Sequence, residues 1–293
     1  MRGSCLCGEV RYAAPGSTGD MWYCHCSACA RSSGVGFGTW VGATAVKWEA
    51  GARSRVRIAG TTPLVRSFCA TCSTPLPAEC GDGGSVMLPA GGLDDISGLR
   101  PAWHAHVAQR APWMPASARL PCYPGSRSAA SQIPAASQPG PASPHRPRSP
   151  LTGGCLCGAI GYEIATPPYA MRACHCSRCR RRSGSSYLVA LACASSGFTF
   201  THGAGSIRHW QLPESARYLV SFCGECGASV PSVIGEVAFI TAGALDSDPG
   251  VRTRCHIYFG SRAAWVDAED DLPHFDAWTP PDFSWSRDET PAA

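Results

Sequence analysis

The sequence has no long hydrophobic run. None of its apolar stretches approaches the roughly 18 residues that a membrane-spanning helix needs, and the opening residues "MRGSCLCGEV" lack the apolar core of a secretory signal. No segment shows a long helical repeat of apolar residues, and only 16% of the residues are charged. We therefore expect a globular, cytoplasmic protein, long enough at 293 residues for two ordinary domains.

Cysteine, in contrast, is abundant, with 18 in the chain. Disulfides are rare in the cytoplasm, where closely spaced cysteines more often hold a metal ion. The alternative, a disulfide framework, is typical of short exported proteins, and this chain has neither property. The cysteines therefore predict metal sites.

An internal repeat organises the chain. Three segments of the first half return in the same order in the second half: "GSCLCGEVRY" at 3–12 as "GGCLCGAIGY" at 153–162, "CHCSACARSSG" at 24–34 as "CHCSRCRRRSG" at 174–184, and "SFCATCSTPLP" at 67–77 as "SFCGECGASVP" at 221–231. We predict two copies of one domain, residues 1–123 and 151–276. Residues 124–150, rich in Pro, Ser and Ala, predict a flexible linker, and 277–293 a poorly ordered tail.

Within each copy, the apolar runs are short and rich in β-branched or aromatic residues. Segments such as "RYLVSFC", "VAFITAGAL" and "SYLVALACA" are bounded by Gly, Pro or Ser, as strands commonly are. We predict two small, mainly β domains built around metal, with the C-x-C and C-x-x-C pairs on hairpin tips or turns.

Fourteen cysteines follow a repeated pattern of C-x-C, C-x-C-x-x-C and C-x-x-C, seven in each copy. Thiolates at these spacings suit Zn²⁺, which takes four ligands in structural sites and commonly three protein ligands in catalytic ones. Seven ligands therefore predict one four-cysteine and one three-cysteine cluster per copy. The four-cysteine clusters are Cys5, Cys7, Cys69 and Cys72, and Cys155, Cys157, Cys223 and Cys226; the three-cysteine clusters are Cys24, Cys26 and Cys29, and Cys174, Cys176 and Cys179. We assign no role to Cys80, Cys122, Cys193 and Cys255.

The three-cysteine clusters are the candidate catalytic sites, because zinc with an open position can bind a substrate. The alternative is that a histidine supplies the fourth ligand. His175 lies between two ligands, and in an extended C-x-C its side chain should point away from the metal. His256 and its counterpart His104 are better candidates to close the sites from a distance.

Taken together, these motifs resemble the glutathione-dependent formaldehyde-activating enzymes, whose domain also occurs in centromere protein V. The resemblance rests on "GGCLCGAIGY", "CHCSRCRRRSG", "SFCGECG", "ALD" and "HIYFGSRAAWVDAEDDLPHF", and covers nearly all of both copies. It implies a small, all-β, zinc-bound fold similar to Mss4, the β-tent. It also implies a structural zinc on each four-cysteine cluster and an active-site zinc on each three-cysteine cluster.

The same resemblance implies a reaction in which a thiolate, glutathione or another small thiol, adds to formaldehyde and gives a product such as S-hydroxymethylglutathione. In the reverse direction this is a carbon–sulfur lyase reaction on a thiol–aldehyde adduct, with Cys174, Cys176 and Cys179 as the catalytic cluster. The alternative is a non-catalytic zinc module for binding or scaffolding, which the resemblance to centromere protein V allows.

Arginines crowd around the last cysteine of the second copy. Arg178, Arg180 and Arg181 are candidate substrate-binding residues, because guanidinium groups can offset an anionic zinc site or clamp the carboxylates of a glutathione-like substrate. The alternative is a solvated basic face. A strong nucleic-acid role is not expected, since the formal net charge of +4 falls to about −2 once fourteen thiolates and four Zn²⁺ are counted.

The second copy keeps more of the family's pattern, so we expect it to carry the activity. Gly227 follows the last C-x-x-C, where a left-handed backbone is convenient, whereas the first copy has Ser73 at a cost of about 1 kcal/mol. Asp270, which we expect to cap a turn, has Ala118 as its counterpart.

Overall fold

The computed structural model describes residues 1–58, 64–81, 83–114, 119–128, 132, 150–215, 218–267 and 270–283. The described chain is mainly β, which confirms the predicted class at that level. Most of the predicted linker and part of the predicted tail lie outside the described residues. Among the helices of the described ranges, none is both long and apolar enough to cross a bilayer.

In its described residues, the first copy contains two sheets and one short helix. A three-stranded sheet has the order β1-β2-β5, and a seven-stranded sheet has the order β10-β3-β4-β9-β8-β7-β6. The strands are β1 (Arg2–Ser4), β2 (Arg11–Ala13), β3 (Ser17–Cys24), β4 (Gly38–Ala43), β5 (Lys47–Ala50), β6 (Arg55–Ile58), β7 (Leu64–Cys69), β8 (Pro75–Cys80), β9 (Val86–Pro89) and β10 (Trp103–Ala105). The helix is α1 (Ser27–Ser33), and the 3-10 turns are η1 (Ala52–Ser54), η2 (Ala90–Gly92) and η3 (Val107–Gln109).

The second copy repeats this plan with its large sheet divided. The sheets have the orders β11-β12-β15, β18-β19-β14-β13-β20-β21 and β16-β17. The strands are β11 (Leu151–Gly154), β12 (Gly161–Ile164), β13 (Ala170–Cys174), β14 (Leu188–Ala194), β15 (Phe198–His202), β16 (Ile207–Gln211), β17 (Leu219–Cys223), β18 (Ser232–Ile234), β19 (Val237–Thr241), β20 (His256–Ile257) and β21 (His274–Phe275). The helix is α2 (Ser177–Ser183), with η5 (Ser195–Gly197), η6 (Ala204–Ser206), η7 (Ala242–Ala244) and η8 (Phe259–Ser261).

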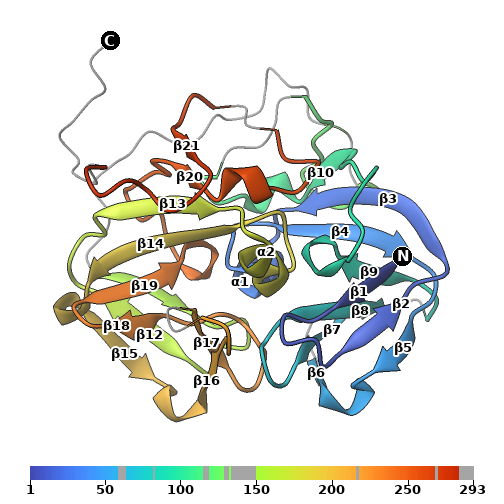
Figure 1. The fold of residues 1–293 in the computed structure, drawn as a ribbon, viewed down its shortest axis with the longest axis horizontal. Coiled ribbons are helices and arrows are strands. Elements are labelled where there is room, and N and C mark those ends of the chain that lie inside the picture. The colour runs from blue at the N-terminus through green and yellow to red at the C-terminus, as the bar shows by residue number, and fades with distance from the viewer. Residues whose placement is uncertain are drawn as a thin grey trace.

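The two copies pack side by side, with α1 and α2 next to each other at the centre (Figure 1). One hydrophobic cluster contains Val35, Phe37 and Trp113 of the first copy together with Met171 and Leu191 of the second. All five side chains are buried, so part of the core of the molecule is shared between the copies. The repeat therefore forms one internally paired body.

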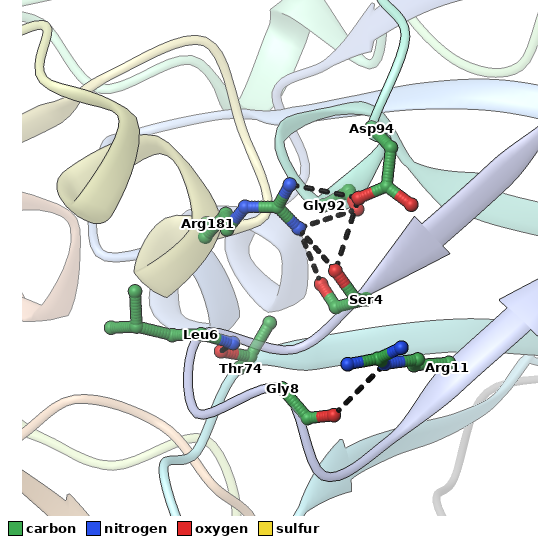
Figure 2. Close-up of polar contacts among 8 residues, drawn as sticks. All are labelled: Ser4, Leu6, Gly8, Arg11, Thr74, Gly92, Asp94 and Arg181. Atoms are coloured by element: carbon green, nitrogen blue, oxygen red, sulfur yellow. Dashed lines mark hydrogen bonds and ion pairs between the residues drawn. The ribbon is translucent and has the colours of Figure 1, made fainter. Parts of the chain in front are cut away.

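Arg181, on α2, reaches from the second copy into the first. Its guanidinium donates to the carbonyl oxygens of Ser4 and Gly92 at 2.9 and 3.3 Å (Figure 2). It also donates to the Ser4 hydroxyl at 2.8 Å and forms an ion pair with Asp94 at 2.8 Å. These contacts place the charged end of Arg181 in the interface between the copies.

Arg31, on α1, makes the corresponding backbone and ion-pair contacts in the opposite direction. It donates to the carbonyl oxygens of Gly154 and Ala244 at 3.1 and 3.3 Å, and it pairs with Asp246. Because Arg31 and Arg181 are counterparts in the repeat, as are the residues they contact, the interface has approximate two-fold symmetry.

Ser73 occupies the left-handed conformation that the sequence predicts for it, with φ of 60°, and its counterpart Gly227 has φ of 69°. The Ser73 hydroxyl is also buried without a hydrogen-bond partner. Ser73→Gly should therefore stabilise the protein by about 1 kcal/mol, measured by chemical denaturation.

The reverse substitution, Gly227→Ser, is the matched comparison for Ser73→Gly. A Cβ at Gly227 would lie 2.4 Å from Cγ of Phe68 in the first copy, so the new side chain would meet a packed ring as well as backbone strain. We expect a loss of about 2–3 kcal/mol. Equal stability of Ser73→Gly and the wild type would contradict the strain argument.

Candidate metal centres

The four-cysteine clusters join the beginning of each copy to its middle. In the first copy, Cys5 and Cys7 lie in the turn between β1 and β2, Cys69 ends β7, and Cys72 lies in the β7–β8 turn. These positions confirm the prediction that the outer cysteine pairs sit on turns. The second copy places Cys155, Cys157, Cys223 and Cys226 in the same way.

The sulfur positions of these clusters fit a tetrahedral metal. The Sγ atoms of Cys5 and Cys7 are 3.4 Å apart and those of Cys7 and Cys69 are 3.7 Å apart. The corresponding distances in the second copy, from Cys157 to Cys155 and to Cys223, are 3.5 and 3.8 Å. A zinc ion with Zn–S bonds of about 2.3 Å would hold its sulfurs about 3.8 Å apart. The four-cysteine clusters can therefore hold metal ions.

The three-cysteine clusters lie where a strand runs into a short helix. Cys174 ends β13, Cys176 caps the N-terminus of α2, and Cys179 lies within α2. The Cys176 sulfur accepts a hydrogen bond from the Cys179 amide at 3.4 Å, and it lies 3.6 Å from the Cys174 sulfur. The prediction of a hairpin tip or turn is wrong for this C-x-x-C, because a cysteine cap and a left-handed Gly184 at the other end suffice to stabilise one short helix.

Within the described ranges, no histidine, aspartate or glutamate groups with the three cysteines of either copy. The His175 side chain points away from the cluster, as predicted, and its Nε2 lies 2.8 Å from Nδ1 of His256. In the first copy, His25 and His104 form the same pair at 2.8 Å. Among the described residues, neither His256 nor His104 lies close enough to group with the three cysteines, so neither supplies a fourth ligand in this structure.

The cysteines within each three-cysteine cluster differ in their pKa values. Hydrogen bonds with Cys174 and Cys179 lower the pKa of Cys176 to about 3, while contact with Cys176 raises the pKa of Cys174 to about 12. In the first copy, the pKa of Cys29 is lowered instead, by its two cysteine neighbours and then by Arg66. The sulfurs of each cluster therefore interact strongly enough to favour a thiolate within it.

The surroundings of Cys29 and Cys179 differ in the residue that supplies a positive charge. In the first copy, the buried Arg66 donates to the Cys29 sulfur at 3.2 Å, and the Trp40 indole donates to it at 3.4 Å. The repeat places Val220 opposite Arg66, so this hydrogen bond is not repeated in the second copy. The buried Arg172 provides the positive charge near Cys174 and Cys179 instead. Sequence reasoning missed Arg66, because a residue that differs between the copies gives no signal in the repeat.

The three predicted substrate-binding arginines lie in three different environments. Arg178 is exposed on α2, and Arg180 donates to the carbonyl oxygen of Ser261 at 3.0 Å. Burial and the charge of Arg181 lower the pKa of Arg180, and the charge of Cys176 opposes this shift in part. Arg181 is held in the interface with the first copy and does not join this group. Sequence reasoning also missed this bridging role, although the arginine recurs at Arg31.

A cavity of about 560 Å³ borders the three-cysteine cluster of the first copy. Trp22, Cys24, Trp103, His106 and Arg127 are among the residues that line it. The rings of Trp22 and Trp103 are stacked, with centroids 5.5 Å apart, and the Arg127 guanidinium lies 4.5 Å from the centre of Trp103. The first copy therefore has room for a small molecule beside Cys24.

Fold and clusters together define a protein of two paired, cysteine-rich, mainly β copies, each with two groups of thiols that could hold metal. The family of glutathione-dependent formaldehyde-activating enzymes matches residues 1–109 and 150–261, and the chain belongs to this family. Among solved structures, a Rhodobacter sphaeroides protein is 22% identical over 33% of this chain and 92% of its own, with a TM-score of 0.30. The comparison with curated proteins gives no match.

Proposed function

We propose that the protein is a zinc-dependent carbon–sulfur lyase of the cytoplasm that acts on a thiol–aldehyde adduct such as S-hydroxymethylglutathione. The observation that carries the proposal is the three-cysteine cluster of the second copy, which has no fourth ligand among the described residues. Membership of the formaldehyde-activating family supports the substrate class. Each copy would be an Mss4-like domain with about two zinc ions.

In this proposal, Cys174, Cys176 and Cys179 hold the zinc ion of the active site. Bound there, zinc would supply the Lewis acidity that lowers the pKa of a substrate thiol. During the lyase reaction the carbon–sulfur bond breaks, the hydroxyl group loses its proton as the aldehyde forms, and the sulfur regains a proton. Arg178 and Arg180 would offset the negative charge of the thiolates and bind the carboxylates of the substrate.

The second copy is the proposed location of the activity, because it keeps more of the family's pattern and has Val220 where Arg66 donates to Cys29 in the first copy. The cavity beside Cys24 favours the other assignment, catalysis by the first copy. The two assignments can be distinguished, because the first requires Cys176 and the second requires Cys26.

A non-catalytic scaffold is the second candidate function, and it requires neither cysteine for a reaction.

Exchange spectroscopy by NMR tests the proposal directly. In a mixture of formaldehyde and glutathione, the wild-type protein should accelerate exchange between the free and the hydroxymethylated thiol. Cys176→Ala should abolish the acceleration, and the matched Cys26→Ala should preserve it. The opposite pattern would assign the activity to the first copy, and unchanged exchange in the presence of wild-type protein would favour the scaffold.

A further inference from the structure

A second group of metal-binding side chains lies beside the three-cysteine cluster of the second copy, at the edge of the sheet. It consists of His256, Asp270 and His274, whose ligand atoms all lie within 4.8 Å of one another. The parallel pairing of β20 with β21 places His256 directly beside His274. Asp270 caps the turn before β21, as predicted, by accepting a hydrogen bond from the Leu272 amide at 3.2 Å.

Distances within this group suit a small divalent ion. Asp270 Oδ2 lies 3.1 Å from Nε2 of His256, and Asp270 Oδ1 lies 4.0 Å from Nε2 of His274. Zinc bonds to nitrogen and oxygen of about 2.0–2.2 Å would hold the ligand atoms roughly 3.3 Å apart. Small rotations of the exposed Asp270 and His274 side chains would bring all three atoms to that separation.

Neighbouring rings hold both histidines in place. His175 Nε2 contacts Nδ1 of His256 at 2.8 Å, which leaves Nε2 of His256 directed at Asp270. The ring of Phe259 is stacked on His274, with centroids 4.1 Å apart. A partner on the second nitrogen of a histidine is the usual support of a metal ligand.

The first copy does not repeat the group. His104 corresponds to His256, but Cys122 pairs with it where His274 pairs in the second copy, and Ala118 replaces Asp270 in the sequence. The Nε2 atom of His104 is buried without a hydrogen-bond partner. The group is therefore specific to the second copy, and the first provides an internal comparison.

We propose that His256, Asp270 and His274 form an additional metal site, which takes a divalent transition ion such as Zn²⁺. Two imidazoles and one carboxylate are a common ligand set for such ions and leave open positions for water or a ligand. Asp270 and His274 are 43% and 32% exposed, which gives an ion a path to the site. His175 connects this site to the backbone between Cys174 and Cys176, so an ion here would lie beside the proposed catalytic cluster.

Metal content at buffered free zinc tests the site in the full-length protein. Wild type should bind one more zinc per chain than Asp270→Asn or His274→Ala, measured by mass spectrometry after equilibrium dialysis. Both replaced side chains are partly exposed, so the variants should fold normally. His202→Ala, which removes an exposed histidine elsewhere in the second copy, should bind as much zinc as wild type.

The test compares the zinc content of the wild type with that of each variant. The difference does not depend on how many cysteine clusters are filled or on any lyase activity. Cobalt gives a second readout when it is added to protein whose cysteine clusters hold zinc and from which the more weakly bound zinc has been removed by dialysis. Wild type should develop visible cobalt absorption without the charge-transfer band of thiolate ligands, and His274→Ala should not. Equal zinc contents in wild type and all three variants would overturn the proposal.

Discussion

Replacing Cys223 with serine should unfold the second copy. Cys223 ends β17, and its cluster joins that strand to the turn after β11 at the beginning of the copy. Structural zinc contributes about 10–16 kcal/mol to small zinc domains, whereas whole domains are stable by about 5–15 kcal/mol. Losing one of four ligands weakens zinc binding, and a loss of even half of that contribution is comparable to the stability of the fold. Loss of dispersed amide signals in NMR spectra would report the unfolding.

Two controls distinguish unfolding caused by loss of metal from unfolding caused by the removal of a cysteine side chain. Cys80→Ser removes a cysteine that lies outside both clusters, and it should retain the wild-type spectrum. A strong chelator added to the wild-type protein should reproduce the effect of Cys223→Ser, and added zinc should reverse it. A folded, chelator-resistant wild-type protein would show that the four-cysteine clusters do not depend on metal.

The cysteine clusters could be predicted from the sequence because their signal is local and occurs twice. The spacing of Cys5 and Cys7, and of Cys69 and Cys72, defines two pairs, and the repeat indicates which pairs belong together. Zinc geometry then decides the partition, since seven thiols cannot fill two tetrahedral sites. The turns around the cysteines follow from the same logic, as the left-handed Ser73 and Gly227 show.

The pairing of the two copies could not be predicted in this way. Arg31 and Arg181 look like parts of a basic segment beside a cysteine cluster, and nothing in the local pattern shows that they reach into the opposite copy. Their contacts join residues 87 to 215 positions apart in the chain, so they depend on the assembled fold. Helix α2 escaped prediction for a different reason, because its seven residues span only two turns and leave no helical periodicity to detect.

Gly243→Ala should weaken the contact between the copies by about 3 kcal/mol. Gly243, in η7, packs against α1 of the first copy, where its amide donates to the carbonyl oxygen of Gly34 at 3.0 Å. An added Cβ would lie 2.4 Å from the carbonyl oxygen of Ala30 and 2.6 Å from the amide nitrogen of Gly36. Both are backbone atoms, which cannot turn aside as a flexible side chain can, so the helix itself would have to move.

The reciprocal position gives a matched test of this interface. A Cβ at Gly91, the counterpart of Gly243, would lie 2.3 Å from the carbonyl oxygen of Arg180, so Gly91→Ala should cost a similar free energy of unfolding. Gly205→Ala adds a Cβ with no atom within 4 Å and should leave the stability unchanged in chemical denaturation. Since both clashes open the same interface, the double variant Gly91→Ala/Gly243→Ala should lose less than the sum of the two single losses. Fully additive losses would mean that the two sides of the interface open independently.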